Sequence, residues 1–395
     1  MNTLLDSLGV DLQEFIDLRR DLHRYPELSF REHRTSDIVA QRLLEWGYKV
    51  ERGLGGTGVV GQIARGDGER HIGIRADMDA LPIEEDSGYA WVSKARGVMH
   101  ACGHDGHIAM LLAAAKALAC DMSWTGTLTL IFQPAEEEGS SRSGAARMIE
   151  DGLFEKYPVD AIYAMHNAPG MPQGTLLFRD GPAMASSDKA IIRIIGRGGH
   201  AARPDQTADP TVAAASLVMA LQTVVSRNIA PTQTAVISVG LLNAGRAYNV
   251  IPQEATVGLS IRALEPAVRE LLERRICAIA QDQARSYGCE AEVEYGHGYS
   301  ALVNTLPETD FARSVALEML GPEQVVTQRS AATGSEDFAF MLECKPGCYL
   351  FIGNGAPGTP GSCTLHNRSY DFNDENIVIG AAYWHLLARR YLAPD

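Results

Sequence analysis

The sequence predicts an α/β protein in which a doubly wound mixed sheet carries a smaller, inserted α+β domain. Short β-branched runs alternate with helical segments over the first half of the chain, which indicates a largely parallel sheet covered by helices. This pattern changes near residue 186 and returns near residue 300. With 395 residues, the chain also exceeds the size of one ordinary core. We therefore expect a discontinuous domain at 1–185 plus 300–395 and an inserted domain at 186–299.

Two helices open the chain, and strands and helices then alternate. Residues 12–28 have apolar side chains at helical spacing until Pro26 ends the helix. Residues 34–48 form a second amphipathic helix, for which Ser36 or Asp37 is the expected N-cap. Four apolar, β-branched runs predict strands, and two longer apolar runs between them predict helices. The strands are at 57–64, 71–79, 125–133 and 160–166, and the helices are at 107–119 and 143–153.

The inserted region has half-buried strands and two long amphipathic helices. Their order is strand–helix–strand–strand–helix–strand, which predicts a ferredoxin-like α+β sandwich with its own core. Beyond residue 300, a buried strand and a final helix restore the pattern of the first half. The strands of the insertion are at 189–196, 234–243, 254–263 and 290–298, its helices are at 210–225 and 265–288, and the later strand and helix are at 348–354 and 375–392.

Composition and charge exclude several classes of function. Hydrophobic residues make up 46% and charged residues 21%, as in soluble globular proteins. No apolar run reaches the length of about 18 residues that a membrane span needs. The formal charge of −14 argues against nucleic acid and anionic membranes as partners. The first residues do not read as a secretory signal, and seven cysteines, an odd number, fit a reduced protein, so we expect a cytoplasmic location.

Metal-binding side chains follow several of the predicted strands. Ligands of a doubly wound sheet bind at the carboxyl ends of its strands, where the strand–helix loops lie. The loop before the helix at 107–119 reads MHACGHDGH, and three consecutive glutamates follow the strand at 125–133. Cysteine, histidine and glutamate together are the ligands of a zinc-like site. The side chains that converge are Asp77, Asp79, Cys102, His104, Glu136, Glu137, Glu138, His166 and His366.

Each of these residues also has a structural interpretation. Consecutive glutamates commonly begin a solvated helix, where the helix dipole favours them. A single histidine such as His166 is more often a satisfied, partly buried side chain than a ligand, and Cys102 alone would be a buried thiol. His100 and His107 are expected to be a hydrogen-bonding scaffold around His104. The convergence of several segments on one rim, rather than any single residue, favours the metal site.

Eight segments, in order and nearly end to end, resemble the M20 metallopeptidase family. They read RADMDALP, MHACGHDGH, FQPAEEEG, MHNAPGMPQGT, GRGGHAARP, YNVIPQEATVGLSIR, GSEDFAF and LHNRSYDFNDE. The branch that they resemble contains hippurate hydrolases and auxin-conjugate (indole-acetyl-amino-acid) amidohydrolases. The resemblance implies a catalytic domain with two divalent metal ions (Zn, Mn, Co or Ni) and an inserted dimerisation or lid domain. It also implies hydrolysis of the amide bond of a small-molecule N-acyl amino acid.

The resemblance assigns roles to individual residues. Glu136 matches the catalytic base, which would exchange protons with the attacking water and the leaving nitrogen. Asp79 is expected to orient a histidine, and Asp77 is not assigned as a ligand because the wider family has a His-x-Asp pair there. Glu138 stands where the family often has a small residue, and we expect it to crowd the site with negative charge. The metal ligands implied are Cys102, His104, Glu137, His166 and His366.

The inserted domain supplies the remaining candidates. By the same resemblance, His200 reaches the active site of a partner subunit and stabilises the developing oxyanion, so a homodimer or larger oligomer would complete the site. Asn249 and Arg262 would bind the carboxylate of the leaving amino acid, although Arg262 could instead face solvent on its strand.

Four other interpretations remain. GRGGHA at 196–201 satisfies a loose dinucleotide-binding pattern, but no helix opens there, Pro204 interrupts, and no acidic residue ends a strand some 20 positions later. A catalytically silent binding protein would be expected to lack the base, and a closed structural zinc site needs only four ligands. A dipeptidase or carboxypeptidase would differ only in the acyl group that it accepts.

Overall fold

The computed structural model describes residues 10–393 and divides the chain into two compact units. The large unit comprises Met1–Gly181, Val303–Ser330 and Asp337–Asp395, and the small unit comprises Pro182–Leu302 and Ala331–Glu336. The small unit thus begins a few residues before the expected position 186. It also includes residues 331–336, which the sequence assigned to the large domain. Backbone pairing explains the difference, because the amide of Ala185 donates to the carbonyl of Ala332 at 3.1 Å.

The large unit is built on one mixed sheet of eight strands in the order β1-β2-β4-β3-β5-β16-β6-β15. The four central strands β4, β3, β5 and β16 are parallel, whereas β1 and β2 are antiparallel to their neighbours. The strands are β1 (Lys49–Leu54), β2 (Gly58–Arg65), β3 (His71–Asp77), β4 (Gly126–Gln133), β5 (Ala161–Pro169), β6 (Leu176–Leu177), β15 (Val325–Val326) and β16 (Gly347–Gly355).

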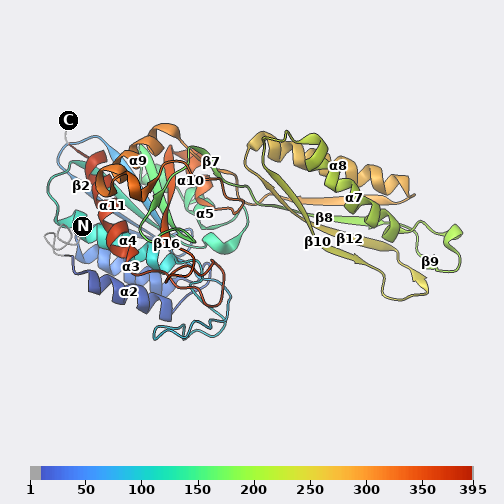
Figure 1. Ribbon diagram of the computed structural model, residues 1–395, viewed down its shortest axis with the longest axis horizontal. Helices are drawn as coiled ribbons and strands as arrows, with labels where there is room; N and C mark the ends of the chain where they lie inside the picture. Colours follow the sequence, from blue (N-terminus) through green and yellow to red (C-terminus); the bar gives the residue numbers. More distant parts are fainter. Residues whose placement is uncertain (1–9, 394–395) are drawn as a thin grey trace. The chain divides into compact units, whose positions relative to one another are not determined.

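Helices cover this sheet, as Figure 1 shows for the large unit. Helix α4 is buried along nearly its whole length because it lies against the sheet and also contacts α2 and α11. All-round apolar character is the usual signature of such an internal helix. The helices of the large unit are α2 (Leu12–Arg24), α3 (His33–Glu45), α4 (His104–Cys120), α5 (Gly144–Glu150), α6 (Leu153–Lys156), α9 (Leu306–Leu320), α10 (Phe338–Cys344) and α11 (Asn376–Tyr391).

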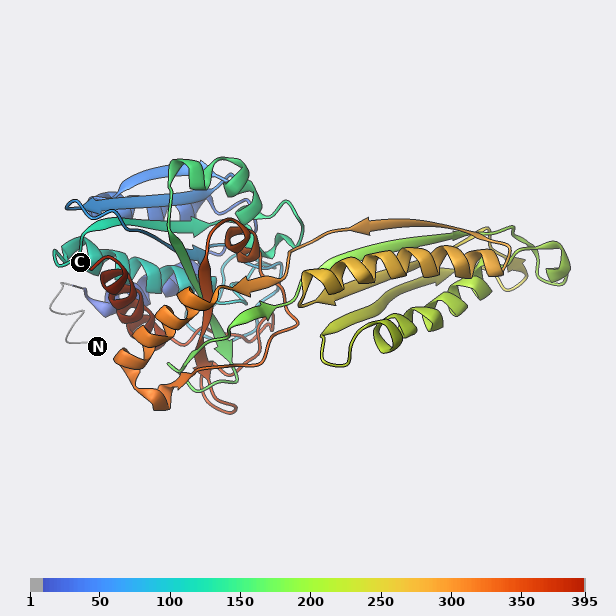
Figure 2. The same cartoon turned by 90° about the horizontal axis from the view of Figure 1, so that it is seen from above.

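The small unit has the predicted order of elements. Its antiparallel sheet runs β10-β12-β8-β13, and α7 and α8 pack side by side against it (Figure 2). A separate apolar core lies between these helices and the sheet. The elements are β8 (Asp188–Ile195), β9 (Gly199–His200), α7 (Pro210–Asn228), β10 (Ala235–Ala244), β11 (Val250–Ile251), β12 (Glu254–Ala263), α8 (Pro266–Ser286) and β13 (Glu290–Gly296), while β7 (Gly181–Met184) and β14 (Leu302–Asn304) pair where the chain passes between units.

The predicted fold class is confirmed, and local corrections concern where helices begin and end. Helix α2 ends at Arg24, before Pro26. The N-cap of α3 is Glu32, so the expectation of Ser36 or Asp37 was wrong; the amide of Ser36 donates to the carbonyl of Glu32 at 2.9 Å and is already inside the helix. Among residues 10–393, no helix is both long enough and apolar enough to cross a membrane.

Candidate metal centre

Two groups of potential metal ligands share the thiol of Cys102. The first contains Cys102, His104 and His166, and the second contains Cys102, Glu137 and His366. In each group, one donor atom from every side chain lies within 4.8 Å of the others. The two groups together comprise the five ligands that the resemblance implies, brought from α4, from the ends of β4 and β5, and from a loop after β16. Thiolate, imidazole and carboxylate donors at such spacing fit divalent metal ions.

Cys102 and His104 are placed by a tight start to α4, which begins at His104 rather than at His107 as expected. Gly103 has a φ of 88°, and a Cβ there would meet the Tyr370 hydroxyl at 2.3 Å, so only glycine fits. The thiol of Cys102 is buried, 3.3 Å from Nε2 of His166. Burial raises the pKa of Cys102, and the charges of Glu137 and Glu136 raise it further. A bound cation would instead stabilise the thiolate.

His104 is oriented by Asp79. Its Nδ1 donates to the backbone carbonyl of Asp79 at 2.9 Å and lies 3.3 Å from the Asp79 carboxylate. Burial disfavours the charged imidazole, but the carboxylates of Asp77, Asp79 and Glu137 outweigh it and raise the pKa of His104 to about 10. The opposite atom, Nε2, is buried and has no hydrogen-bond partner among residues 10–393. At this raised pKa the nitrogen carries a proton, 3.6 Å from the carboxylate of Asp77, and a bound divalent ion would take the place of that proton.

The three glutamates diverge because they form a 3₁₀ turn. Ala135 just before them is left-handed, with φ 49° and ψ 48°. Glu136 is buried, with 6% of its surface exposed, and it lies in a further ligand group with His104 and Glu137. Glu137 Oε1 is 3.2 Å from Nε2 of His366. Glu138 is exposed and accepts from the amide of Ser140 at 2.9 Å, so the expectation that it crowds the site was wrong: the turn directs it outward.

In a competing group of Asp77, His104 and His107, the side chains of Asp77 and His107 are already hydrogen-bonded. Nδ1 of His107 lies 2.6 Å from the carboxylate of Asp77, and its Nε2 accepts from the amide of Asn167 at 3.1 Å. The other oxygen of Asp77 accepts from Arg75 at 2.9 Å. His107 and Asp77 therefore act as scaffold beneath the cluster.

Sequence reasoning missed several supporting residues. The side chain of Asn167 donates through Nδ2 to the carbonyl of Cys102 at 2.6 Å and accepts through Oδ1 from the Tyr370 hydroxyl at 2.9 Å. Arg75 bridges Asp77 and Asp337, with Asp337 3.2 Å away. Asn167 directly follows His166 and was within reach of sequence analysis. Asp337, in the GSEDFAF segment, comes from so far along the chain that only the fold reveals it.

The candidates of the small unit lie at opposite ends of its sheet. His200 pairs with Val250 in a short ladder, and the carbonyl of Asn249 accepts from Ala201 at 3.1 Å, so His200 and Asn249 lie together in exposed loops. Arg262 is half-buried near the other end of β12, where its guanidinium donates to Ser335 at 3.0 Å. Arg262 lies eight positions beyond Glu254 along the extended strand, or about 26 Å away.

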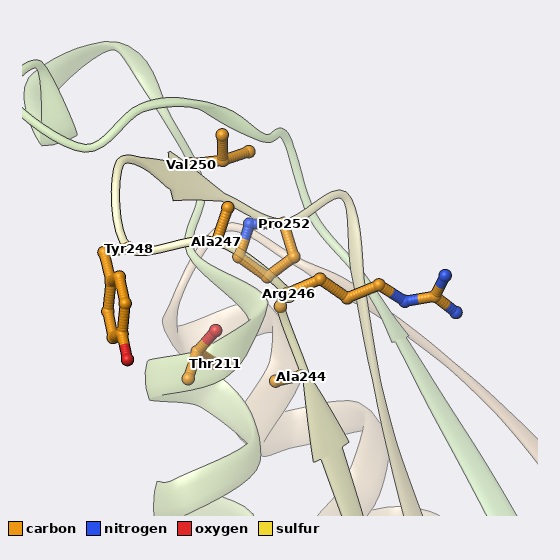
Figure 3. Close-up of a pocket in the computed structure, with 8 residues that line it drawn as sticks. Thr211, Ala244, Arg246, Ala247, Tyr248, Val250 and Pro252 are labelled. Carbon is orange, nitrogen blue, oxygen red and sulfur yellow. The ribbon is translucent and has the colours of Figure 1, made fainter.

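The loop that carries Asn249 lines a shallow pocket of about 440 Å³ that is open to solvent (Figure 3). Figure 3 shows Tyr248 and Arg246 projecting from opposite sides of this loop, near Thr211 of α7. Tyr248 is fully exposed, and Val250 is 52% exposed. This end of the small unit therefore presents aromatic, apolar and cationic side chains to its surroundings.

Comparison with known proteins connects this geometry to a family. The model of peptidase family M20/M25/M40 matches residues 73–390. A hippurate hydrolase of Campylobacter jejuni is 43% identical over 384 residues, which cover 97% of this chain and 98% of that protein. An N-acetyl-L-cysteine deacetylase of Bacillus subtilis is 37% identical, with 94% of this chain and 86% of that protein covered.

A solved structure extends the similarity to the whole fold. A dinuclear metal-binding peptidase of the M20 family from Bacillus subtilis superposes with a TM-score of 0.84 at 31% identity, covering 97% of this chain and 99% of that one. The family predicted from the sequence motifs is thus confirmed. With its two-unit architecture and its cluster of thiol, imidazole and carboxylate donors, the chain belongs to peptidase family M20/M25/M40.

Proposed function

We propose that this protein is a metal-dependent amidohydrolase that cleaves an N-acyl amino acid into a carboxylic acid and a free amino acid. The observation that carries the proposal is the pair of ligand groups that share Cys102 beside a buried glutamate, Glu136. The similarity to a hippurate hydrolase and an N-acetyl-L-cysteine deacetylase supports this class of substrate.

The five ligands would hold two divalent ions, and Glu136 would move the proton. When bound, the ions supply an acidified water and polarise the amide carbonyl. Glu136 lies within 4.8 Å of donor atoms of His104 and Glu137 but is outside both groups that contain Cys102. It can therefore take a proton from the attacking water and pass it to the leaving nitrogen. The thiol favours Zn, Co or Ni, and the carboxylates also suit Mn.

His200 is suited to donate a hydrogen bond to the developing oxyanion. Its Nδ1 accepts from the amide of Ala202 at 3.1 Å, so the proton of the neutral ring resides on Nε2. An exposed N–H of this kind stabilises negative charge once substrate and protein enclose it. Asn249, in the adjoining loop, would bind the carboxylate of the substrate beside it.

We further propose that a second copy of the chain completes the site. His200 and Asn249 lie about 26 Å along the small unit's sheet from Asp188 and Arg262, the end at which the chain enters and leaves this unit. Strand β10 is an edge strand, and Leu241 and Leu242 on it are 53% and 52% exposed. Met219 of α7 is 70% exposed. Apolar side chains along an unpaired edge favour pairing with another copy, which would carry His200 to its partner.

Arg262 would serve the site of its own chain, because it lies at the end of the small unit's sheet away from His200 and Asn249, where the chain enters and leaves this unit. A cytoplasmic location stays a prediction, supported by the absence of any disulfide among the seven cysteines.

The test is release of free amino acid from a panel of N-acyl amino acids after reconstitution with Zn, Mn, Co or Ni. Hippurate, N-acetyl amino acids and indole-acetyl conjugates head the panel, dipeptides extend it, and Glu136→Gln is the blank. Release that disappears in the blank establishes the activity. Cleavage of dipeptides alone would show that the protein is a dipeptidase instead. No release of amino acid from any substrate by folded, metal-loaded protein would contradict an enzyme of either kind.

A further inference from the structure

One carboxylate oxygen holds two strained residues that are far apart in the sequence. Within residues 10–393, only three residues other than glycine have a positive φ: Phe30 at 62°, Ala135 at 49° and His366 at 61°. The amides of Phe30 and Ala135 both donate to Oε1 of Glu32, at 3.0 and 2.9 Å. Left-handed backbone is unfavourable for such residues and persists only where surrounding contacts enforce it. Glu32 makes that contact at both positions.

Glu32 is a costly residue to bury for a purely structural purpose. It is completely buried, and no basic side chain pairs with it in the described part of the chain. Its second oxygen accepts from the Thr57 hydroxyl, at 2.5 Å. Burial raises the pKa of Glu32 to about 7, although the bond from Thr57 opposes this. Whether ionised or protonated on Oε2, the side chain keeps Oε1 as the acceptor for both amides.

The turn that Glu32 holds is the one that aims the glutamates. Ala135 immediately precedes Glu136, so fixing its amide sets the direction in which the chain leaves β4. On the other side of the turn, the amide of Glu137 donates to the carboxylate of Asp79 at 2.9 Å. The same Asp79 oxygen accepts from the hydroxyl of Ser29 at 2.7 Å, next to Phe30. The segment at 29–32 therefore anchors both ends of the turn.

We propose that Glu32 is a positioning residue that sets the Glu136–Glu137 pair at the metal centre. The inference rests on the proposed function for its kinetic consequence but not for its effect on metal coordination. Partners that orient metal ligands and their neighbours typically change metal affinity or activity by about 10- to 100-fold when removed. Glu32 acts through the backbone of Ala135 and does not touch the reacting atoms.

The test compares Glu32→Ala, Glu32→Gln and a matched control, Glu27→Ala. Glu27 also accepts two backbone amides, from Arg34 at 3.0 Å and Thr35 at 2.8 Å, but these belong to α3 and not to the glutamate turn. Each variant is loaded with Co²⁺, and the visible absorption spectrum, the bound metal per chain, kcat, KM and the thermal midpoint are measured. The spectrum reports the geometry at the metal and needs no substrate.

Glu32→Ala is expected to alter the Co²⁺ spectrum and to lower metal affinity or kcat by about 10- to 100-fold, with KM changed far less. Glu32→Gln keeps the carbonyl acceptor and should keep the Co²⁺ spectrum, the metal affinity and kcat close to those of wild type. Glu27→Ala should lower the thermal midpoint while leaving the spectrum and kcat near wild type. If Glu32→Ala does not fold, Glu32→Ala combined with Ala135→Gly should, because glycine relieves the positive φ.

A wild-type spectrum and wild-type kcat in folded Glu32→Ala would overturn the proposal, as would equal spectral changes in Glu32→Ala and Glu27→Ala. An altered spectrum in a protein that hydrolyses no N-acyl amino acid would leave the positioning role standing and contradict the proposed function alone.

Discussion

The candidate metal cluster of the large unit and the exposed end of the small unit differ in burial and in the number of hydrogen bonds that hold their side chains. At the cluster, His104 is 0% and Glu136 6% exposed, and the side chains beneath them are held by several hydrogen bonds. At the other region, His200 and Asn249 lie in exposed loops, and Tyr248 beside them is fully exposed. A mostly buried cluster, in which His366 is exposed, is preorganised by its own chain and can stabilise charge without further rearrangement, whereas exposed donors form stronger hydrogen bonds only when water is excluded from them.

The largest expected effect is at the buried region. Glu136→Gln should reduce kcat by at least about 10³-fold, because the amide cannot accept a proton, while bound metal stays near the wild-type amount. Hydrolysis and metal content are measured on the same samples. Glu138→Gln, two residues further along the same turn and exposed, is the matched control and should remain close to wild type. Loss of metal in Glu136→Gln would mean that the roles of Glu136 and Glu137 are exchanged.

The exposed region should show the next largest effect. His200→Ala should lower kcat by about 10²- to 10³-fold through loss of an oxyanion donor. Mixing this variant with Glu136→Gln and re-forming dimers should recover part of the activity, because each heterodimer contains one intact site. Co-expression with two purification tags isolates the hybrids for assay. Absence of recovery in verified hybrids would indicate that His200 serves its own chain.

Much of the buried site could be predicted because its signals are local. The ends of β3 and β4 were readable from apolar runs, and the candidate ligands Cys102, His104 and Glu137 lie in the segments that follow them, while His166 lies within β5. The hydrogen bond from the amide of Ala135 to the carboxylate of Glu32 joins residues more than one hundred positions apart, so no local sequence pattern reveals it. The outward direction of Glu138 depends on the backbone of Ala135 and on a 3₁₀ turn. The two-residue strands β6 and β15 are too short for any periodicity to reveal.

A smaller effect is expected for Arg262, which lies at the other end of the small unit from His200. Arg262→Ala should raise KM by about 10- to 100-fold with a modest change in kcat, since a charged hydrogen bond to a carboxylate contributes roughly 1.5–3 kcal/mol. Ser335→Ala removes only the neighbour to which Arg262 donates, at 3.0 Å, and is the control. In hybrids with Glu136→Gln, activity should depend on Arg262 in the chain that carries the intact Glu136. Dependence on the other chain would contradict the division between the two ends.

The smallest effect concerns stability beneath the cluster. His23 is buried, and Nδ1 lies 2.8 Å from Asp105. Burial opposes its charge, but Asp105 and Glu85 raise the pKa of His23 to about 9 from 6.5. A raised pKa stabilises the fold below pH 6.5, and this contribution, at most on the order of 3 kcal/mol, is lost as pH rises towards 9. The free energy of unfolding, measured with urea, should therefore fall across this pH range in wild type and fall less in His23→Gln. Parallel plots of this free energy against pH for the two proteins would contradict the prediction.

The most direct test of the account is a metal titration of metal-free protein, with bound ions per chain and hippurate hydrolysis measured on each sample. We predict that activity rises with ion binding and reaches its maximum as two ions per chain are bound, and that Cys102→Ala, which removes the donor common to both groups, prevents this. Full hydrolysis without bound ions, or two ions per chain bound equally well by Cys102→Ala, would contradict the central claim.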